Sequence, residues 1–292
     1  MEAVLLNYPL PPLFLNQDRE GRYLVIDGLQ RTSTLKSFNE NRFALQDLER
    51  LSVLNGKRWA DLPPELHSRI EDRTLNCYVL KPSVPLPVIN DIFARINTGG
   101  TELNRQEIRH ALYQGRATLL LDELSIIPEY KDWIGFLLSP RRMGDVEAVL
   151  RCIAFARIDP EVAYKDDMDE FLVGTMKELN VASEDELAEI RAQFVRVWPV
   201  SRRVFGENAF RMSTAHTKGR VNLAITETVY RFVATKSDAW IAKNERVLAD
   251  NYTRLLTDKN YLDSVRYATG DKNRVRTRFR VAQAQLGVAC VD

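Results

Sequence analysis

The stretch YLVIDGLQRTSTL, residues 23–35, changes from apolar to polar within one residue. Residues 23–26 are typical of a buried strand, and the pair Asp27-Gly28 that follows is a common turn. The Thr-Ser-Thr run at residues 32–34 predicts the cap of a helix that extends from about Thr34 to Asn39. The stretch therefore predicts a strand that leads through a tight turn into the start of a helix.

Such a junction presents unpaired backbone N–H groups, which attract anions. Arg31 adds a planar fork of donors that matches phosphate oxygens two at a time, and Gly28 permits close approach of the backbone. Asp27 could hold a metal ion or orient Arg31. The same residues also fit an ordinary turn with Arg31 paired to Asp27, and no P-loop pattern GxxxxGK[ST] occurs. The residues alone leave both interpretations open.

A second polar cluster lies in FARINTGGTELNRQEIR, residues 93–109. The pattern predicts a helix over 88–96, a stop at Gly99-Gly100, and a new helix that begins near 103–105. Four polar side chains would then gather around a tight loop: Arg95, Asn97, Glu107 and Arg109. A helical corner with ion pairs across the loop is the simpler interpretation of this cluster.

The rest of the chain predicts an α+β protein. Residues 1–115 combine short helices with strands, including a proline-stiffened approach at 8–15, a hairpin turn at 16–21 and a strand at 75–80. From residue 116 to 292 the pattern is helical. The apolar spacing there predicts helices at 146–156, 168–179, 183–198, 222–234 and 238–255. We therefore expect a small α/β module over 1–115 and a mainly α-helical domain over 116–292.

Composition excludes several classes of protein. The 292 residues carry a formal net charge of +1, so no global charge favours nucleic acid or membrane. The three cysteines are Cys77, Cys152 and Cys290, a number and spacing that argue against a disulfide framework or a zinc site. No apolar run approaches the roughly 18 residues of a membrane span. These features predict a cytoplasmic protein without a membrane partner.

The most basic stretch is RVRTRFR, residues 274–280. It offers four candidates for contact with DNA phosphates: Arg274, Arg276, Arg278 and Arg280. On a helix these side chains spread around the surface, so a solvated face with acidic partners is the alternative. His67, His110 and His216 are isolated in the sequence, and we expect no self-contained nuclease site.

Taken together, the two polar clusters resemble the N-terminal domain of GmrSD-type modification-dependent restriction systems. That family carries a strand followed by DGQQR, which stands here as DGLQR over residues 27–31, and a segment FxRINTGG, which stands here over residues 93–100. Segments 8–15, 103–107 and 142–151 resemble further parts of the family pattern, so the resemblance covers nearly the whole chain.

The resemblance implies a ParB/sulfiredoxin-like fold that binds and hydrolyses a nucleoside triphosphate with Mg²⁺. It assigns catalysis to Asp27, Gln30 and Arg31, with Asp27 also as the metal ligand. Arg31 and backbone amides would neutralise phosphate charge, and Gln30 would orient the attacking water. The nucleotide-binding residues would be Gly28, Thr32, Ser33, Thr34, Arg95 and Asn97.

The chain departs from the family pattern in three ways. Leu29 replaces the first glutamine of DGQQR, which puts hydrolysis in doubt if that position faces the ligand. The family's first strand is missing, so either the module is truncated or a partner completes it. The histidine-rich nuclease half of the larger enzymes is also missing. We therefore expect a nucleotide-binding module, an NTPase or a degenerate one, of a bacterial restriction or anti-phage defence system that acts with a separate effector. A non-catalytic DNA-binding or scaffold protein with the same fold is the alternative.

Overall fold

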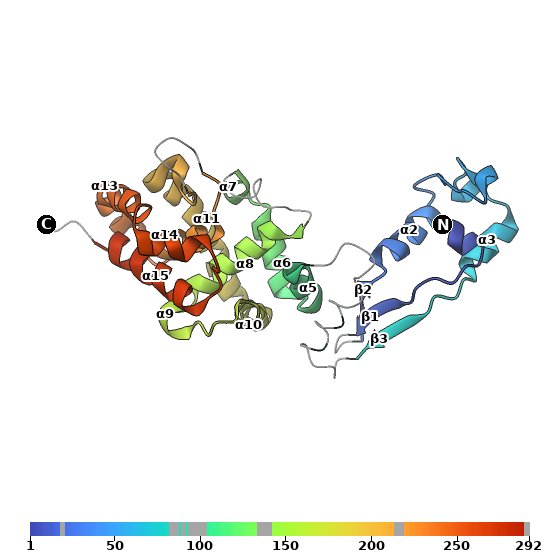
Figure 1. The fold of residues 1–292 in the computed structure, drawn as a ribbon, viewed down its shortest axis with the longest axis horizontal. Helices are drawn as coiled ribbons and strands as arrows, with labels where there is room; N and C mark the ends of the chain where they lie inside the picture. The colour runs from blue at the N-terminus through green and yellow to red at the C-terminus, as the bar shows by residue number, and fades with distance from the viewer. Residues whose placement is uncertain are drawn as a thin grey trace. The chain divides into compact units, whose positions relative to one another are not determined.

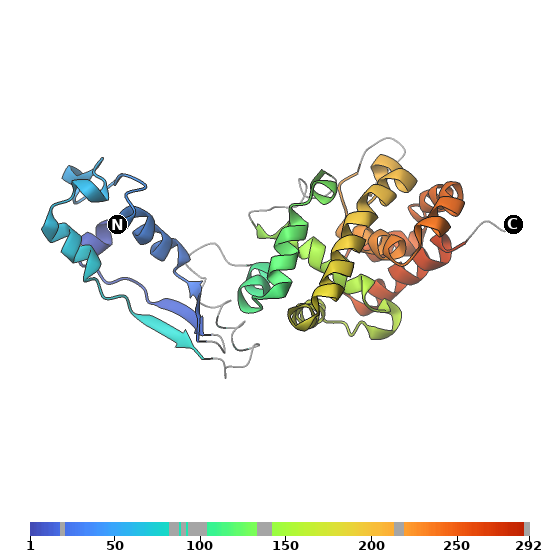
Figure 2. The same cartoon turned by 180° about the vertical axis from the view of Figure 1, so that it is seen from behind.

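The structure is a computed structural model that describes residues 1–17, 21–81, 104–132, 142–212 and 219–288, together with Val88 and Ile92. The chain divides into two compact units, Met1–Leu103 and Asn104–Asp292 (Figures 1 and 2). The first unit contains a small mixed sheet with short helices, and the second unit is helical. The predicted α+β class is confirmed.

The sheet of the first unit has the strand order β2-β1-β3. Strand β1 (Leu13–Gln17) pairs antiparallel with β2 (Tyr23–Asp27) and parallel with β3 (Cys77–Leu80). The register of the β1–β2 pair shifts between Phe14 and Leu15, where a bulge increases the local twist. The strands that the sequence predicts on either side of residues 16–21 are confirmed, as is the strand near 75–80.

Short helices complete the first unit, and a small apolar core holds them together. The helical segments are α1 (Glu2–Leu5), α2 (Leu29–Asn39), α3 (Pro64–Glu71) and the 3₁₀ turns η1 (Ser52–Leu54) and η2 (Trp59–Asp61). The buried members of the core are Leu5, Phe38, Leu45, Leu48 and Leu62. Phe38 packs edge-on against Trp59, with ring centroids 6.0 Å apart, so α2 is anchored by its C-terminal half.

The start of α2 was predicted wrongly. The helix begins at Leu29 rather than near Thr34, because Gly28 adopts φ +100° and turns the chain directly from β2 into the helix. The helix therefore needs no side-chain cap, and the Thr-Ser-Thr run lies inside the helix. The hydroxyl of Thr32 donates to the carbonyls of Gly28 and Leu29, as serine and threonine commonly do within helices.

The second unit is a bundle whose helices are α5 (Arg105–Leu112), α6 (Arg116–Ser125), α7 (Pro128–Tyr130), α8 (Gly144–Ala156), α9 (Pro160–Ala163), α10 (Met168–Val181), α11 (Glu184–Phe205), η6 (Gly206–Asn208), α12 (Leu223–Ala234), α13 (Asp238–Leu255), α14 (Lys259–Arg266) and α15 (Lys272–Leu286). Helices α8 and α12 pack against each other and are buried along most of their length. An aromatic cluster fills the bundle interior: Tyr130, Phe194, Trp198, Phe210 and Tyr230.

The five helices predicted in this unit are confirmed, and four of them begin at a side-chain cap. Ser183, Asn222 and Ser237 each accept a backbone N–H in the first turn of the helix that follows. Helix α5 belongs by its contacts to this unit, since Asn104 donates to the carbonyl of Arg142, whereas the sequence pattern predicts a boundary near Gly115. No helix in the described part of the chain has both the length and the apolar run needed to cross a bilayer.

Candidate functional site

The β2–α2 junction is tightly packed around Gly28. A Cβ atom at this position would overlap Cδ2 of Leu13 and lie 3.3 Å from Nη2 of Arg31. The positive φ of Gly28 adds strain for any other residue. Glycine is therefore favoured here by the backbone turn and by the Leu13 side chain, whose tip would have to move for any larger residue. The junction begins a helix of 11 residues whose first-turn N–H groups have no carbonyl partner within the helix.

Arg31 is held in place by three hydrogen bonds. Its Nη2 donates to Oδ2 of Asp27 at 2.5 Å and to the carbonyl of Pro12 at 3.3 Å, and its Nη1 donates to the carbonyl of Pro11. The pairing with Asp27, which the sequence left as an alternative, is therefore present. Guanidinium has five N–H donors, so Nε–H and one N–H of Nη1 are not used by these bonds. About 30% of each side chain of the ion pair stays exposed.

A cavity of about 260 Å³ lies beside this arginine. Gln30, Arg31 and Thr34 contribute the polar part of its wall, and the remaining wall is apolar: Met1, Ala3, Val4, Leu10 and Leu35. The structure thus brings two of the predicted catalytic residues to one cavity. Thr32 and Ser33 do not line it, and their hydroxyls bond back to carbonyls of their own helix.

Leu29 and Gln30 are both exposed in the first turn of α2. The side chain of Leu29 is 65% exposed and does not line the cavity beside Arg31. The position where this chain departs from DGQQR is therefore outside the core. Gln30 is exposed as well, but it lines the cavity, so its amide is available to a bound molecule.

A Mg²⁺ ion at this junction would depend on Asp27. Within the described ranges, no group of three or more His, Cys, Asp or Glu side chains could hold a metal ion. Mg²⁺ in nucleotide enzymes typically uses one or two carboxylates and completes its shell with water and substrate phosphates. A single carboxylate at Asp27 fits that pattern only together with a nucleotide. The Asp27 carboxylate would then have to bind Mg²⁺ and Arg31 at the same time.

The second polar cluster is only partly described. Arg95 and Asn97, which the sequence assigns to nucleotide binding, lie outside the described residues. Glu107 accepts the Asn104 backbone N–H in a capping box at the start of α5 and pairs with Arg142 at 3.2 Å. Arg109 is buried against Asp169 and Glu147 of the helical unit. Glu107 and Arg109 therefore stabilise the helical unit.

Among the four arginines of α15, Arg278 is misassigned as a DNA contact. It is fully buried, and its Nη2 lies 2.8 Å from Oε2 of Glu227. Arg274 donates to the carbonyl of Asp263, and Nε of Arg276 is buried with no partner among the described residues. Arg280 is exposed. The four side chains therefore do not form one basic surface, because the helix turns Arg278 toward the bundle interior.

Arg278 ends a chain of alternating charges that the sequence did not reveal. Oε1 of Glu227 accepts from Nε of Arg151, and Arg151 lies 3.5 Å from Glu147, which in turn lies 3.3 Å from Arg109. Burial lowers the pKa of Arg109 and of Arg278, although both remain cations because the ordinary pKa of arginine is above 12. A glutamate inside the apolar run LAITETVYRFVA was the signal that could have identified the centre of this chain.

The histidines in the described part of the chain have structural partners. His67 stacks on Trp59 with ring centroids 4.3 Å apart, and its Nε2 lies 2.8 Å from the carbonyl of Trp59. His110 lies 2.9 Å from Asp122. His216 lies outside the described residues.

Comparison with known families supports the resemblance seen in the sequence. Residues 1–114 match the family described as GmrSD restriction endonuclease, N-terminal domain. The match covers less than half of the chain, and it shows that this segment is similar to a domain of restriction systems. No curated protein and no solved structure matches the chain.

Proposed function

We propose that the first unit binds a nucleoside triphosphate together with Mg²⁺ at the β2–α2 junction, as an NTPase or a degenerate NTPase of a bacterial restriction or anti-phage system. The observation that carries the proposal is the position of Arg31. Its guanidinium is fixed at a helix start, retains unused N–H donors and borders a cavity of about 260 Å³. Charge-assisted bonds from a fixed guanidinium and from first-turn amides favour phosphate.

Each site residue has a defined task in this proposal. Arg31 would neutralise phosphate charge, and the left-handed turn at Gly28 would present the first-turn amides of α2 to it. Asp27 would bind Mg²⁺, which neutralises phosphate charge when bound. Gln30, whose side chain lines the cavity, would bond the ligand and orient water for hydrolysis. Thr34 lines the cavity and could donate its hydroxyl to the ligand. A separate effector would respond to nucleotide binding or hydrolysis by this unit. Arg95 and Asn97 are proposed as further contacts to the nucleotide.

The alternative function is a non-catalytic scaffold or DNA-binding protein. One observation favours it: three of the five N–H donors of Arg31 are already used to bind Asp27, Pro11 and Pro12. In that case Arg31 serves only to hold the proline-rich approach to β1 against the start of α2. DNA binding would then rest on exposed cations such as Arg280, and its affinity would fall steeply with salt.

A titration with each of the four nucleoside triphosphates and Mg²⁺ distinguishes the two functions. We expect saturable binding to the full chain, measured calorimetrically, and at least ten-fold weaker binding by Gln30→Ala. Gln30 is exposed and lies at the cavity, so this variant should fold normally. Gln46→Ala, an exposed glutamine of the same unit, is the matched control and should bind as the parent does. Absence of binding by any triphosphate would favour the scaffold.

Hydrolysis needs a separate assay because the motif contains Leu29. Phosphate release from the bound triphosphate identifies an NTPase, and binding without release identifies a sensor. Leu29→Gln restores the family motif at an exposed position, so its effect on stability should stay within about 0.5 kcal/mol. An increase in phosphate release in this variant would show that the departure at residue 29 limits hydrolysis.

A further inference from the structure

The cavity beside Arg31 extends along the first two turns of α2. Gln30 and Arg31 border it from the first turn of the helix, and Thr34 and Leu35 border it from the second turn. The opposite wall comes from the α1 region and the segment after it: Met1, Ala3, Val4 and Leu10. Its volume of about 260 Å³ is below the range of about 300 to 1,000 Å³ that is usual for small-molecule sites, so it holds only a part of a nucleoside triphosphate.

The charge of this cavity is confined to one end. Arg31 is the one charged side chain among the described lining residues, and it lies in the first turn of α2, where the positive end of the helix dipole also lies. In the second turn the polar group is Thr34, whose hydroxyl makes no hydrogen bond to another described residue. The hydroxyls of Thr32 and Ser33 bond back to α2, so within this run Thr34 is the one that keeps its hydroxyl for a ligand.

The remaining wall is apolar. Val4 is buried, and the other four apolar lining residues are partly buried: Met1, Ala3, Leu10 and Leu35. A phosphate laid against this wall would lose hydration without gaining hydrogen bonds. A planar ring would instead gain free energy in proportion to the apolar area removed from water. The cavity therefore suits the uncharged part of a nucleotide, and the start of α2 suits the phosphates.

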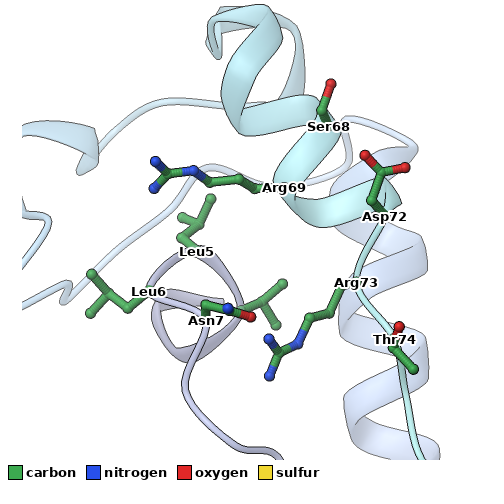
Figure 3. A pocket seen from close by; sticks show the side chains of 9 residues that line it. Leu5, Leu6, Asn7, Ser68, Arg69, Asp72, Arg73 and Thr74 are labelled. Carbon is green, nitrogen blue, oxygen red and sulfur yellow. The ribbon is translucent and has the colours of Figure 1, made fainter.

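The larger cavity of the first unit, of about 770 Å³, does not offer this arrangement. It lies at the C-terminal ends of α1 and α3, where the helix dipoles disfavour an anion. Figure 3 shows the guanidiniums of Arg69 and Arg73 on different sides of the end of α1, so they do not converge on one phosphate. Of these two cavities, the one beside Arg31 is the better place for a nucleotide.

We infer that the apolar wall takes the nucleoside part of the bound triphosphate. The base lies between α1 and the second turn of α2, and a ribose hydroxyl bonds Thr34, while the phosphates lie over the start of α2. This inference rests on the proposed function, because Arg31 and the first-turn amides must hold the phosphates. It adds that α1 is part of the site and that the nucleoside contributes to affinity through apolar contact.

The probes are the four nucleoside triphosphates and inorganic tripolyphosphate, which keeps the anionic groups but lacks the nucleoside. In calorimetric titrations of the full chain with Mg²⁺, we expect at least one nucleoside triphosphate to bind at least about ten-fold more tightly than tripolyphosphate. Ala3→Leu enlarges an apolar side chain of the cavity wall. It should weaken binding of that triphosphate at least about ten-fold and leave the affinity for tripolyphosphate unchanged. Ala60→Leu, at an exposed alanine of the same unit, is the matched control and should bind both probes as the parent does.

Thr34→Val tests the ribose contact without filling the cavity. Thr34 is exposed and valine has nearly the same shape, so the fold should persist. Loss of one hydrogen bond should weaken binding of the nucleoside triphosphate roughly three- to ten-fold, with no effect on tripolyphosphate. Ser33→Ala removes a neighbouring exposed hydroxyl that does not line the cavity, and it should change neither affinity.

The outcomes separate failure of this inference from failure of the proposed function. Weaker binding of the nucleoside triphosphate by Ala3→Leu and Thr34→Val, with constant binding of tripolyphosphate, supports the inference. Two results would overturn it and leave phosphate binding at Arg31 standing: equal affinity of the parent for tripolyphosphate and every nucleoside triphosphate, or parental affinity for the triphosphate in both variants. No binding of any probe by the parent would contradict the proposed function, and this inference with it. If circular dichroism shows that Ala3→Leu is unfolded, the comparison of Thr34→Val with Ser33→Ala decides.

Discussion

The arginines of the two units have different surroundings. In the helical unit, Arg109, Arg151 and Arg278 are buried, and each faces at least one carboxylate. In the first unit, Arg31 is partly exposed beside a cavity and Arg69 has no partner among the described residues. A guanidinium that is buried with its carboxylate is committed to the fold, because separating the pair leaves an uncompensated charge. A partly exposed guanidinium beside a cavity keeps donors for a ligand.

The apolar cores of the two units also differ, because the core of the first unit is much smaller. Among the described residues of the first unit, five buried apolar side chains form the main core, whereas the helical unit has a far larger continuous cluster. A small core supplies little surplus stability. We therefore expect the first unit to unfold at a lower denaturant concentration than the helical unit, and ligand binding to be visible as stabilisation of that first transition.

The largest expected effect comes from the centre of the buried charge chain. Glu227→Gln removes the carboxylate shared by Arg151 and Arg278, which leaves two buried guanidiniums without that counter-charge. We expect a loss of about 3–5 kcal/mol in the free energy of unfolding of the helical unit, measured by urea denaturation. The transition of the first unit should not move.

An exposed ion pair is the matched control for this substitution. Glu123→Gln breaks the pair with Arg191, in which both side chains are partly exposed, and should cost less than about 1 kcal/mol. Similar losses for both glutamate variants would contradict the distinction between buried and exposed arginine pairs.

Gly28→Ala should have the next largest effect, and on the other unit. It combines strain at φ +100° with an overlap between the new Cβ and the tip of the buried Leu13 side chain, so we expect a loss of about 2 kcal/mol in the stability of the first unit. Gly56 has a similar φ of +83°, but a Cβ added there would have no heavy atom of the described residues within 4 Å, so Gly56→Ala should cost about 1 kcal/mol. Equal losses would show that the overlap with the Leu13 side chain is not a constraint.

A smaller effect is expected at Tyr164, whose hydroxyl donates to the carbonyl of Gly270 at 2.5 Å. Tyr164→Phe should cost about 1 kcal/mol at neutral pH. Burial raises the pKa of Tyr164 to about 12. Because the unfolded chain releases this proton near pH 10 and the folded chain does not, stability is fully present below about pH 10 and decreases between about pH 10 and 12. The phenylalanine variant should lose less stability over that range, as followed by urea denaturation at each pH.

Local signals in the sequence were sufficient for much of the fold. Ser183 and Asn222 cap the helices that they were expected to start, and the hairpin of β1 and β2 follows from alternation around a turn. The true start of α2 was also present in the sequence, since a glycine directly after a strand allows the left-handed turn at Gly28. The Thr-Ser-Thr run was a stronger apparent signal but belongs to the helix interior.

Pairing between distant residues could not be predicted in the same way. Arg278 meets Glu227 across 51 positions, and Arg31 meets the carbonyls of Pro11 and Pro12 across 20 and 19 positions. The spacing of arginines in α15 does not predict which of them is buried, and the motif at residues 27–31 does not predict the partners of Arg31. The cavity beside Arg31 could not be predicted either, because Met1, Ala3 and Leu10 contribute to its wall from a distant segment of the chain.

The most direct test of nucleotide binding at the β2–α2 junction is the shift of the first unfolding transition with a triphosphate and Mg²⁺, compared between the parent chain and Arg31→Lys. Lysine keeps the charge but loses the fork that bonds phosphate oxygens in pairs. At about 100 times Kd, the parent should gain roughly 2.7 kcal/mol, and Arg31→Lys should lose most of that gain while remaining folded. An equal gain in both proteins, or no gain in the parent with any of the four triphosphates, would contradict the assignment.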